Sequence, residues 1–135
     1  MDMKLLKIAS DVKFTKKLNI FSHSANKKNP ICGDKINIKI NLKKNVIKGI
    51  HYETKSCIYC QASASFLAKY FINKNIKKVA ETLNNISKYY EGQFIFMNRG
   101  LIKIFNKNNF KRKECLYLPA RAFFKALNLK KNLNQ

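Results

Sequence analysis

The chain has 135 residues and a formal charge of +21, carried by 28 lysines and arginines against seven aspartates and glutamates. This length suits one domain, which we expect to span residues 1–135 and to bury its core without disulfide staples. Lysines interrupt every apolar run before about 18 residues, which argues against a membrane-spanning segment. The N-terminus lacks the pattern of a secretion signal, so we expect a reducing cytoplasm and free thiols.

The excess of positive charge has two explanations. It fits a nucleic-acid-binding surface, for which Phe94 to Arg112 is the best candidate stretch. However, the chain contains 25 lysines but three arginines, beside 17 asparagines and 15 isoleucines. Lysine, asparagine and isoleucine all have A/T-rich codons, so a biased genome produces this composition without selection for a polyanion. The charge keeps a basic nucleic-acid-binding module with structural cysteines as the alternative function. It is not the leading one, because no helix-turn-helix or RNP pattern supports it.

The first half of the chain predicts a short helix followed by a hairpin. Leu5 to Ala9 could form the helix, and the polar stretch after it holds one candidate short strand, Phe21 to Ser24. Ile36 to Leu42 alternates apolar and polar residues, which is the pattern of a half-buried strand. Lys43 to Asn45 predicts a turn, and Val46 to Glu53 predicts the returning antiparallel strand.

The second half is mostly helical in pattern. Gln61 to Phe71, Ile76 to Tyr90 and Leu116 to Leu129 place apolar residues at helical spacing, and Pro119 suits a first helical turn. Glu91 to Arg112 is either an extra helix or a packed excursion. The order of elements predicts an α+β fold: a small antiparallel sheet of about three strands with helices packed on one face.

Three cysteines and one carboxylate form the main chemical pattern. Cys32-Gly33-Asp34, Cys57 and Cys115 supply three thiolates and one oxygen, enough for a four-coordinate zinc or iron site, and thiolates also carry sulfur. Cys57 lies where a strand passes into a helix, and Cys115 lies near the start of the last helix. Helix N-termini favour the thiolate form. The alternative is that the cysteines are buried fillers and that Asp34 caps a turn.

These residues also carry a family resemblance that covers Asn29 to Leu127. Asn29-Pro30-Ile31-Cys32-Gly33-Asp34 resembles the N-P-x-C-G-D signature of NifU/IscU-type iron–sulfur cluster scaffold proteins. Cys57, followed by the small residues of Gln61 to Ser65, resembles their second cysteine and its helix. Arg112 to Cys115 has the R-x-x-C spacing of the SufU branch, which the chain resembles most.

The resemblance implies a SufE/NifU-like fold and a ligand set of Cys32, Asp34, Cys57 and Cys115 that holds zinc, iron or a transient [2Fe-2S] cluster. It also implies a scaffold or sulfur-transfer protein rather than an enzyme, with Cys32 and Cys115 as candidate sulfur acceptors in a sulfurtransferase-like step. The implied partners are a pyridoxal-phosphate cysteine desulfurase and downstream apo iron–sulfur proteins or carriers. Arg112 would offset the negative charge of the site if its fork met Asp34 or Cys115.

Two residues depart from the family pattern. Cys60 stands where SufU proteins commonly have serine, and forms C-x-x-C with Cys57. It is a resolving or sulfur-receiving thiol, half of a redox dithiol, or a small buried residue; the dithiol reading would make the chain an oxidoreductase. Glu114 replaces the histidine that precedes the last cysteine in IscU proteins, so an IscU-style histidine ligand is missing. We expect His23 and His51 to lie outside the site.

Overall fold

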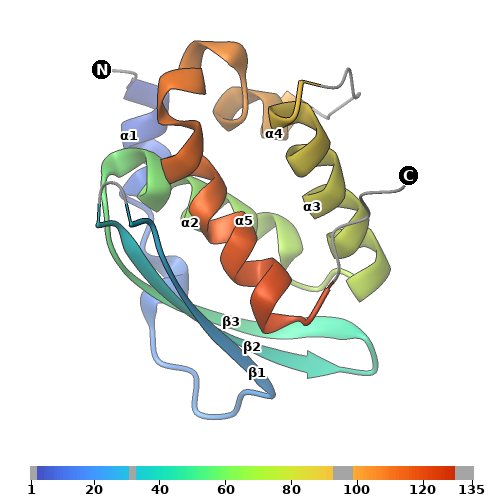
Figure 1. The fold of residues 1–135 in the computed structure, drawn as a ribbon. Coiled ribbons are helices and arrows are strands. Elements are labelled where there is room, and N and C mark those ends of the chain that lie inside the picture. Colours follow the sequence, from blue (N-terminus) through green and yellow to red (C-terminus); the bar gives the residue numbers. More distant parts are fainter. Residues whose placement is uncertain (1–2, 31–32, 93–98, 130–135) are drawn as a thin grey trace.

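The computed structural model describes residues 3–30, 33–92 and 99–129. It confirms the predicted α+β class, because the strands form one antiparallel sheet in the order β1-β2-β3 with helices on one face (Figure 1). The elements are α1 (Met3–Ala9), η1 (Lys13–Thr15), β1 (His23–Lys28), β2 (Lys35–Lys43), β3 (Val46–Lys55), α2 (Ile58–Phe71), α3 (Ile76–Tyr90), α4 (Arg99–Ile104), η2 (Lys107–Arg112) and α5 (Lys113–Ala126).

The central hairpin follows the predicted alternation. Ile36, Ile38 and Ile40 of β2 are buried, and their neighbours on the strand point to the other face of the sheet. Lys44 and Asn45 both have positive φ, 50° and 63°, in the connection to β3. Positive φ at both central residues is the geometry of the tight hairpin turn that matches strand twist. The predicted turn and returning strand are therefore confirmed.

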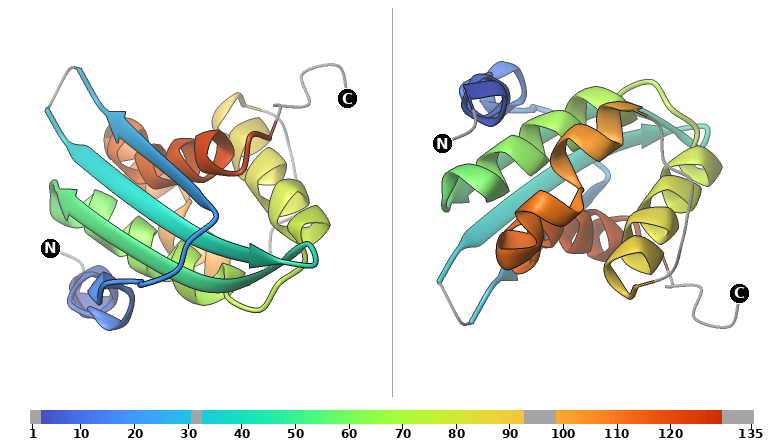
Figure 2. Two further views of the ribbon diagram at one scale, coloured as in Figure 1. Left: turned by 90° about the horizontal axis from the view of Figure 1, so that it is seen from below. Right: turned by 90° about the horizontal axis from the view of Figure 1, so that it is seen from above.

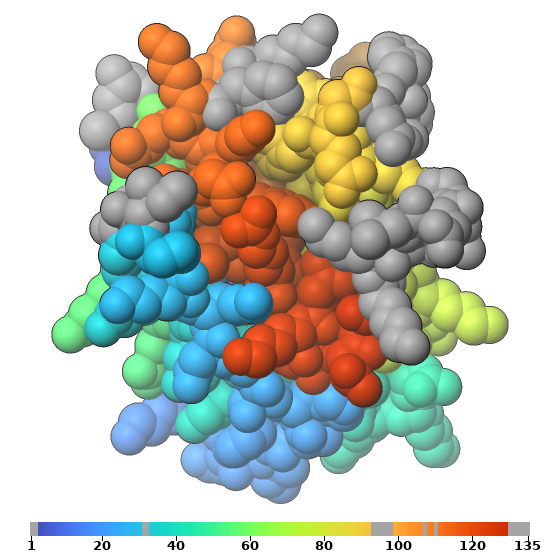
Figure 3. Space-filling model, viewed as in Figure 1, coloured from blue at the N-terminus to red at the C-terminus, as the bar shows by residue number. Residues whose placement is uncertain are grey.

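The helices cover one face of this sheet. α5 lies over β1 and β2, and α2 packs against β3 and α5, with α1 beside α2 (Figure 2). In the space-filling view, α5 lies between β1 and α3 (Figure 3). The largest buried side chains include Phe71 of α2 and Phe123 of α5, whose rings meet edge to face at 5.0 Å. The core thus lies between the sheet and the α2–α5 pair.

The segment after η1 crosses the opposite face of the sheet. The Lys16 carbonyl accepts a hydrogen bond from His51 Nδ1 at 2.7 Å. A Cβ added to Gly49 would lie 2.9 Å from Leu18 Cδ1, so the glycine allows this close approach. Because the segment covers only the half of the face near Gly49 and His51, the other half, at the end of β2 nearer Lys35, stays open.

The structure refines two predicted elements. The N-terminal strand covers His23–Lys28 instead of Phe21 to Ser24, because its ladder with β2 runs from His23 to Lys28. The region Glu91 to Arg112 contains the extra helix α4, whose Leu101 and Ile104 are buried. No helix in the described ranges combines the length and the apolar composition that a bilayer crossing requires.

Helix α5 begins three residues earlier than predicted, at Lys113. The prediction that Pro119 lies in the first turn is wrong, since Pro119 is the seventh residue of this helix. Proline has no N–H, so the Cys115 carbonyl lacks the donor it would receive from residue 119. The next carbonyl, that of Leu116, accepts a 2.6 Å hydrogen bond from the buried Ser63 hydroxyl of α2.

We expect Ser63→Ala to lower the free energy of unfolding by about 0.5–1.5 kcal/mol, because the change removes a buried hydrogen bond that joins α2 to α5. Chemical denaturation monitored by circular dichroism measures the effect. Ser10→Ala is the matched control, since its hydroxyl bonds the Lys7 carbonyl at the surface, and we expect a change below about 0.5 kcal/mol. Equal effects of both substitutions would contradict the role given to Ser63.

Candidate metal centre

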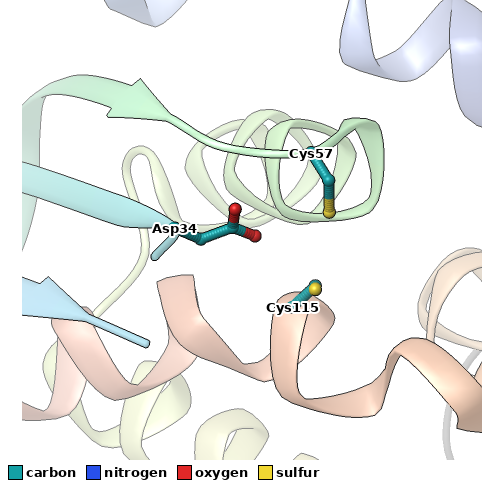
Figure 4. Close-up of side chains that lie close together, drawn as sticks. All are labelled: Asp34, Cys57 and Cys115. Carbon is teal, nitrogen blue, oxygen red and sulfur yellow. The ribbon is translucent and has the colours of Figure 1, made fainter. Parts of the chain in front are cut away.

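Asp34, Cys57 and Cys115 meet at one end of the sheet. Asp34 directly precedes β2, Cys57 lies between β3 and α2, and Cys115 lies in the first turn of α5. Their ligand atoms all lie within 4.8 Å of one another, and the side chains point toward a common space (Figure 4). Cys32, the fourth predicted ligand, lies outside the described residues. The structure therefore brings three of the four predicted ligands together.

A tight turn positions Asp34. Gly33 N–H donates to the Asn29 carbonyl at 2.8 Å, and Asn29 N–H donates to the Asp34 carbonyl at 2.8 Å. Gly33 has φ of +79°, in the left-handed region where a side chain is strained. The glycine between Cys32 and Asp34 therefore allows a backbone turn that other residues avoid.

Two helix N-termini approach the same space. Cys57 is the N-cap of α2, and its carbonyl accepts the first helical hydrogen bond, from Gln61 N–H at 3.1 Å. Cys115 is the third residue of α5. The positive ends of the two helix dipoles stabilise negative charge, so both sulfurs lie where an anionic ligand is favoured.

The buried carboxylate gives an independent test of whether a cation fits. Asp34 is 8% exposed, and its Oδ2 has no hydrogen-bond partner among the described residues. Cys115 is 6% exposed. Two negative charges about 4 Å apart repel by about 4 kcal/mol near a protein surface. A cation between the three groups would remove this repulsion and supply the carboxylate with a partner, and the sulfur and oxygen donors suit zinc or iron.

Arg112 places a positive charge beside the thiols. The pKa of its guanidinium is raised, first by a hydrogen bond to Cys57 and then by the charges of Cys57 and Cys115. Its Cζ lies 5.1 Å from the centre of the Tyr59 ring, which holds the side chain over the start of α2. Of the groups around the Arg112 fork, Cys57 takes the hydrogen bond, and the charge of Cys115 also acts on the guanidinium.

The sequence analysis missed a hydroxyl network beside the site. Thr54 Oγ1 donates to the Lys35 carbonyl at 2.6 Å and lies 2.7 Å from Ser56 Oγ. Lys35 directly follows one ligand and Ser56 directly precedes another. Thr54 therefore ties together the two backbone segments that carry Asp34 and Cys57.

One sequence signal could have revealed this network. Ile50 and Tyr52 of β3 point toward the core, and Thr54 is the next residue on the same face. A polar residue at the next inward position of a strand needs a hydrogen-bond partner. The side chain of Thr54 was therefore a candidate for a local structural role before any coordinates were known.

We expect Thr54→Val to weaken zinc binding by about 10–100-fold, the usual effect of removing a group that orients metal ligands. Valine keeps the shape of threonine but cannot bond the Lys35 carbonyl. Thr54→Ser keeps the hydroxyl and should restore most of the affinity. Competition with a chromophoric chelator measures the zinc affinity, and equal affinities for the valine and serine variants would contradict the prediction.

Cys60 lies next to Thr54, outside the group of converging donors. Its side chain is fully buried, and its Sγ lies 3.9 Å from Thr54 Oγ1. Burial raises the pKa of the Cys60 thiol to about 12, so it is protonated at neutral pH. Cys57, Cys60 and Cys115 are free thiols, and Cys60 is absent from the group of converging donors. These observations favour the small buried residue over a reactive second thiol.

The other candidate ligands are engaged elsewhere. The Glu114 carboxylate pairs with Arg121, with Oε2 2.9 Å from Nη1. His51 bonds the Lys16 carbonyl and His23 Nδ1 lies 2.7 Å from Ser22 Oγ. Within the described ranges, none of the three joins the group of Asp34, Cys57 and Cys115.

Comparison with known proteins agrees with this geometry. The NifU-like N terminal domain family matches residues 11–93, a span that includes Asp34 and Cys57. A curated relative, the iron-sulfur cluster assembly scaffold protein IscU of Thermotoga maritima, is 27% identical over 89 residues. That alignment covers 66% of this chain and 63% of the relative, so the match spans less than two thirds of that protein's length.

Two solved structures share the fold. One is a putative iron-sulfur cluster assembly scaffold protein for the SUF system from Fervidobacterium islandicum AW-1, with a TM-score of 0.87, 22% identity, and 94% and 96% of the two chains covered. The other is the N-terminal part of a nitrogen-fixing NifU-like protein from Brucella abortus, with a TM-score of 0.83, 18% identity, and 94% and 91% covered. Since the family match covers more than half of the sequence, the chain belongs to the family of NifU-like N-terminal domains.

Proposed function

We propose that this chain is an iron–sulfur cluster assembly scaffold or sulfur-acceptor protein of SufU-like type. Cys32, Asp34, Cys57 and Cys115 would hold zinc, iron or a transient [2Fe-2S] cluster. The convergence of Asp34, Cys57 and Cys115 within 4.8 Å supports this proposal most directly. The name of the Thermotoga maritima relative, a scaffold protein, points to the same role.

The proposed sulfur step uses a thiolate of this chain. The thiolate of Cys32 attacks the outer sulfur of a persulfide on the cysteine desulfurase, the S–S bond of that persulfide breaks, and the desulfurase cysteine leaves as a thiolate. The sulfur now forms a persulfide on this chain, and no oxidant is consumed. Cys115 is 6% exposed, which limits the access of a partner to its sulfur, so we keep Cys115 as the second acceptor.

The neighbouring residues tune this step. The guanidinium of Arg112 donates to Cys57 and offsets the negative charge of the thiolates. Asp34 provides one oxygen among sulfur donors, and an oxygen ligand holds a soft ion less tightly than sulfur does. Zinc or iron held by Cys32, Asp34, Cys57 and Cys115 would supply positive charge that offsets the thiolates. In this proposal the chain is not an enzyme, works in the cytoplasm, and passes its cargo to apo iron–sulfur proteins or carriers.

Metal and labile-sulfide analysis of anaerobically purified protein tests the proposal. One zinc per chain together with stimulation of the desulfurase would support sulfur transfer. A visible chromophore after reconstitution with iron and sulfide would support the scaffold role. Absence of bound metal, of a chromophore and of persulfide on the chain after incubation with the desulfurase and cysteine would contradict both versions.

A further inference from the structure

Three lysines stand side by side on the open face of the sheet. Lys28 of β1 pairs with Lys35 of β2, and Lys35 pairs with Lys55 of β3. Directly opposed residues of antiparallel strands point to the same face, and like charges there destabilise the sheet. All three side chains are exposed, and none takes part in the ion pairs found within the described ranges. This lysine row is therefore a charge arrangement that folding alone disfavours.

A second row completes a groove next to the lysine row. Asn26, Asn37 and Glu53 occupy the neighbouring register positions of the same three strands. The two rows line an open groove of about 480 Å³, on the half of the outer face that the segment after η1 leaves uncovered. Glu53 is its one carboxylate among the described residues that line it. The groove therefore combines several lysines with two amide side chains, those of Asn26 and Asn37.

The groove lies at the end of the sheet that carries the metal centre. Lys35 directly follows Asp34, and Lys55 precedes Cys57 by two residues. The left view of Figure 2 shows this sheet face, with the helices behind it. A partner seated on the lysine row would therefore lie close to the proposed sulfur-accepting residues without covering the far helices.

We propose that the lysine row and its groove dock an acidic segment of the cysteine desulfurase that delivers sulfur to this chain, an inference that rests on the proposed function. Carboxylates of that segment would pair with Lys28, Lys35 and Lys55, and the amides of Asn26 and Asn37 would bond its polypeptide backbone. Binding would relieve the repulsion within the row, because each ammonium gains a counter-charge that the free protein does not provide.

The same features disfavour nucleic acid as the occupant. Single-strand binders combine positive charge with aromatic rings on which bases stack. No aromatic side chain is among the described residues that line the groove. Glu53 in the second row would repel a phosphate backbone, whereas a mixed polypeptide segment can place a polar or basic residue against it.

The test compares two triple variants of the full chain. The row variant carries Lys28→Gln, Lys35→Gln and Lys55→Gln. The matched control carries Lys48→Gln, Lys77→Gln and Lys103→Gln, three exposed lysines that do not line the groove. We expect the row variant to bind the organism's own cysteine desulfurase about tenfold more weakly than wild type by calorimetry, with the difference shrinking at high salt. The control should stay within about twofold of wild type.

The stability of the variants gives a second readout. Because the row variant loses like-charge repulsion, its melting temperature should be equal to or higher than that of wild type, while its binding is weaker. If the lysine row were only a solvated surface, the substitutions would not weaken desulfurase binding while keeping or raising the melting temperature. Should the row variant lose its zinc, Lys28→Glu alone, outside the ligand segments, must still weaken binding severalfold.

Several outcomes would overturn the docking inference. If the row and control variants bind the desulfurase equally weakly, the effect comes from the loss of net charge and not from the position of the lysines. Row-dependent binding of an oligothymidylate with unchanged desulfurase binding would assign the groove to nucleic acid. If wild type accepts persulfide sulfur but the row variant binds the desulfurase normally, only the docking inference fails; if wild type accepts no sulfur, the proposed function itself fails.

Discussion

Cys57→Ser is expected to lower zinc affinity by more than about a hundredfold, since one of the four proposed ligands is lost and structural zinc sites in peptides bind with about 10–16 kcal/mol in total. Serine is itself a good helix N-cap, so α2 should still begin at the same residue. A loss of zinc affinity would then result from the missing thiolate and not from a change at the start of α2. Zinc content by mass spectrometry under native conditions and affinity by chelator competition measure the change.

Cys60→Ser is the matched control for this experiment. It removes a thiol three residues away, but that thiol is fully buried, protonated and placed beside Thr54 outside the converging donors. The serine hydroxyl can keep the contact with Thr54. We expect zinc affinity within about threefold of wild type. A loss as large as that of Cys57→Ser would show that Cys60 is a ligand and would contradict the assigned centre.

Asp34→Ala is expected to make a reconstituted cluster persist about tenfold longer, because the weakest ligand provides the route by which a soft metal leaves a thiolate site. Decay of the visible absorbance after anaerobic reconstitution, with and without an apo ferredoxin as acceptor, measures the lifetime. The substitution also removes a buried carboxylate oxygen that lacks a partner in the described structure, so the fold itself should tolerate it.

Asp11→Ala provides the comparison for Asp34→Ala. Asp11 is a carboxylate that pairs with Lys69 of α2 instead of pointing into the metal centre, and that contact holds the pKa of Asp11 below its usual value. Its removal changes the net charge by the same amount, and cluster lifetime should not change. An unchanged lifetime in Asp34→Ala as well would mean that the carboxylate does not control release.

Local patterns in the sequence predicted most of the fold. The alternation from Ile36 to Leu42 and the turn at Lys44 and Asn45 depend on neighbouring residues alone, and the structure has both. Helices α2 and α3 could be predicted from the spacing of their apolar residues, which is also a local feature. Pro119 was misplaced because its local preference is for a first turn, whereas α5 extends upstream to place Cys115 inside the helix.

The candidate site also has features that the local sequence predicts and features that depend on tertiary packing. The motif around Gly33 and the position of Cys57 at a helix start are local features, so the sequence identified these residues as ligands or supports. The partner of Arg112 and the contacts of Thr54 depend on which segments pack together. Sequence spacing contains no such information, so neither contact could be identified from the sequence.

The sequence by itself determined the kinds of donor available, the hairpin, the main helices and the resemblance to cluster scaffold proteins. Only the tertiary structure decided that Asp34, Cys57 and Cys115 share one space, that Cys60 lies outside it, and that Lys28, Lys35 and Lys55 form a row. The physical reason is that periodicity and turn chemistry act over a few residues, whereas these groups meet through strand register and through the packing of α2 and α5 on the sheet.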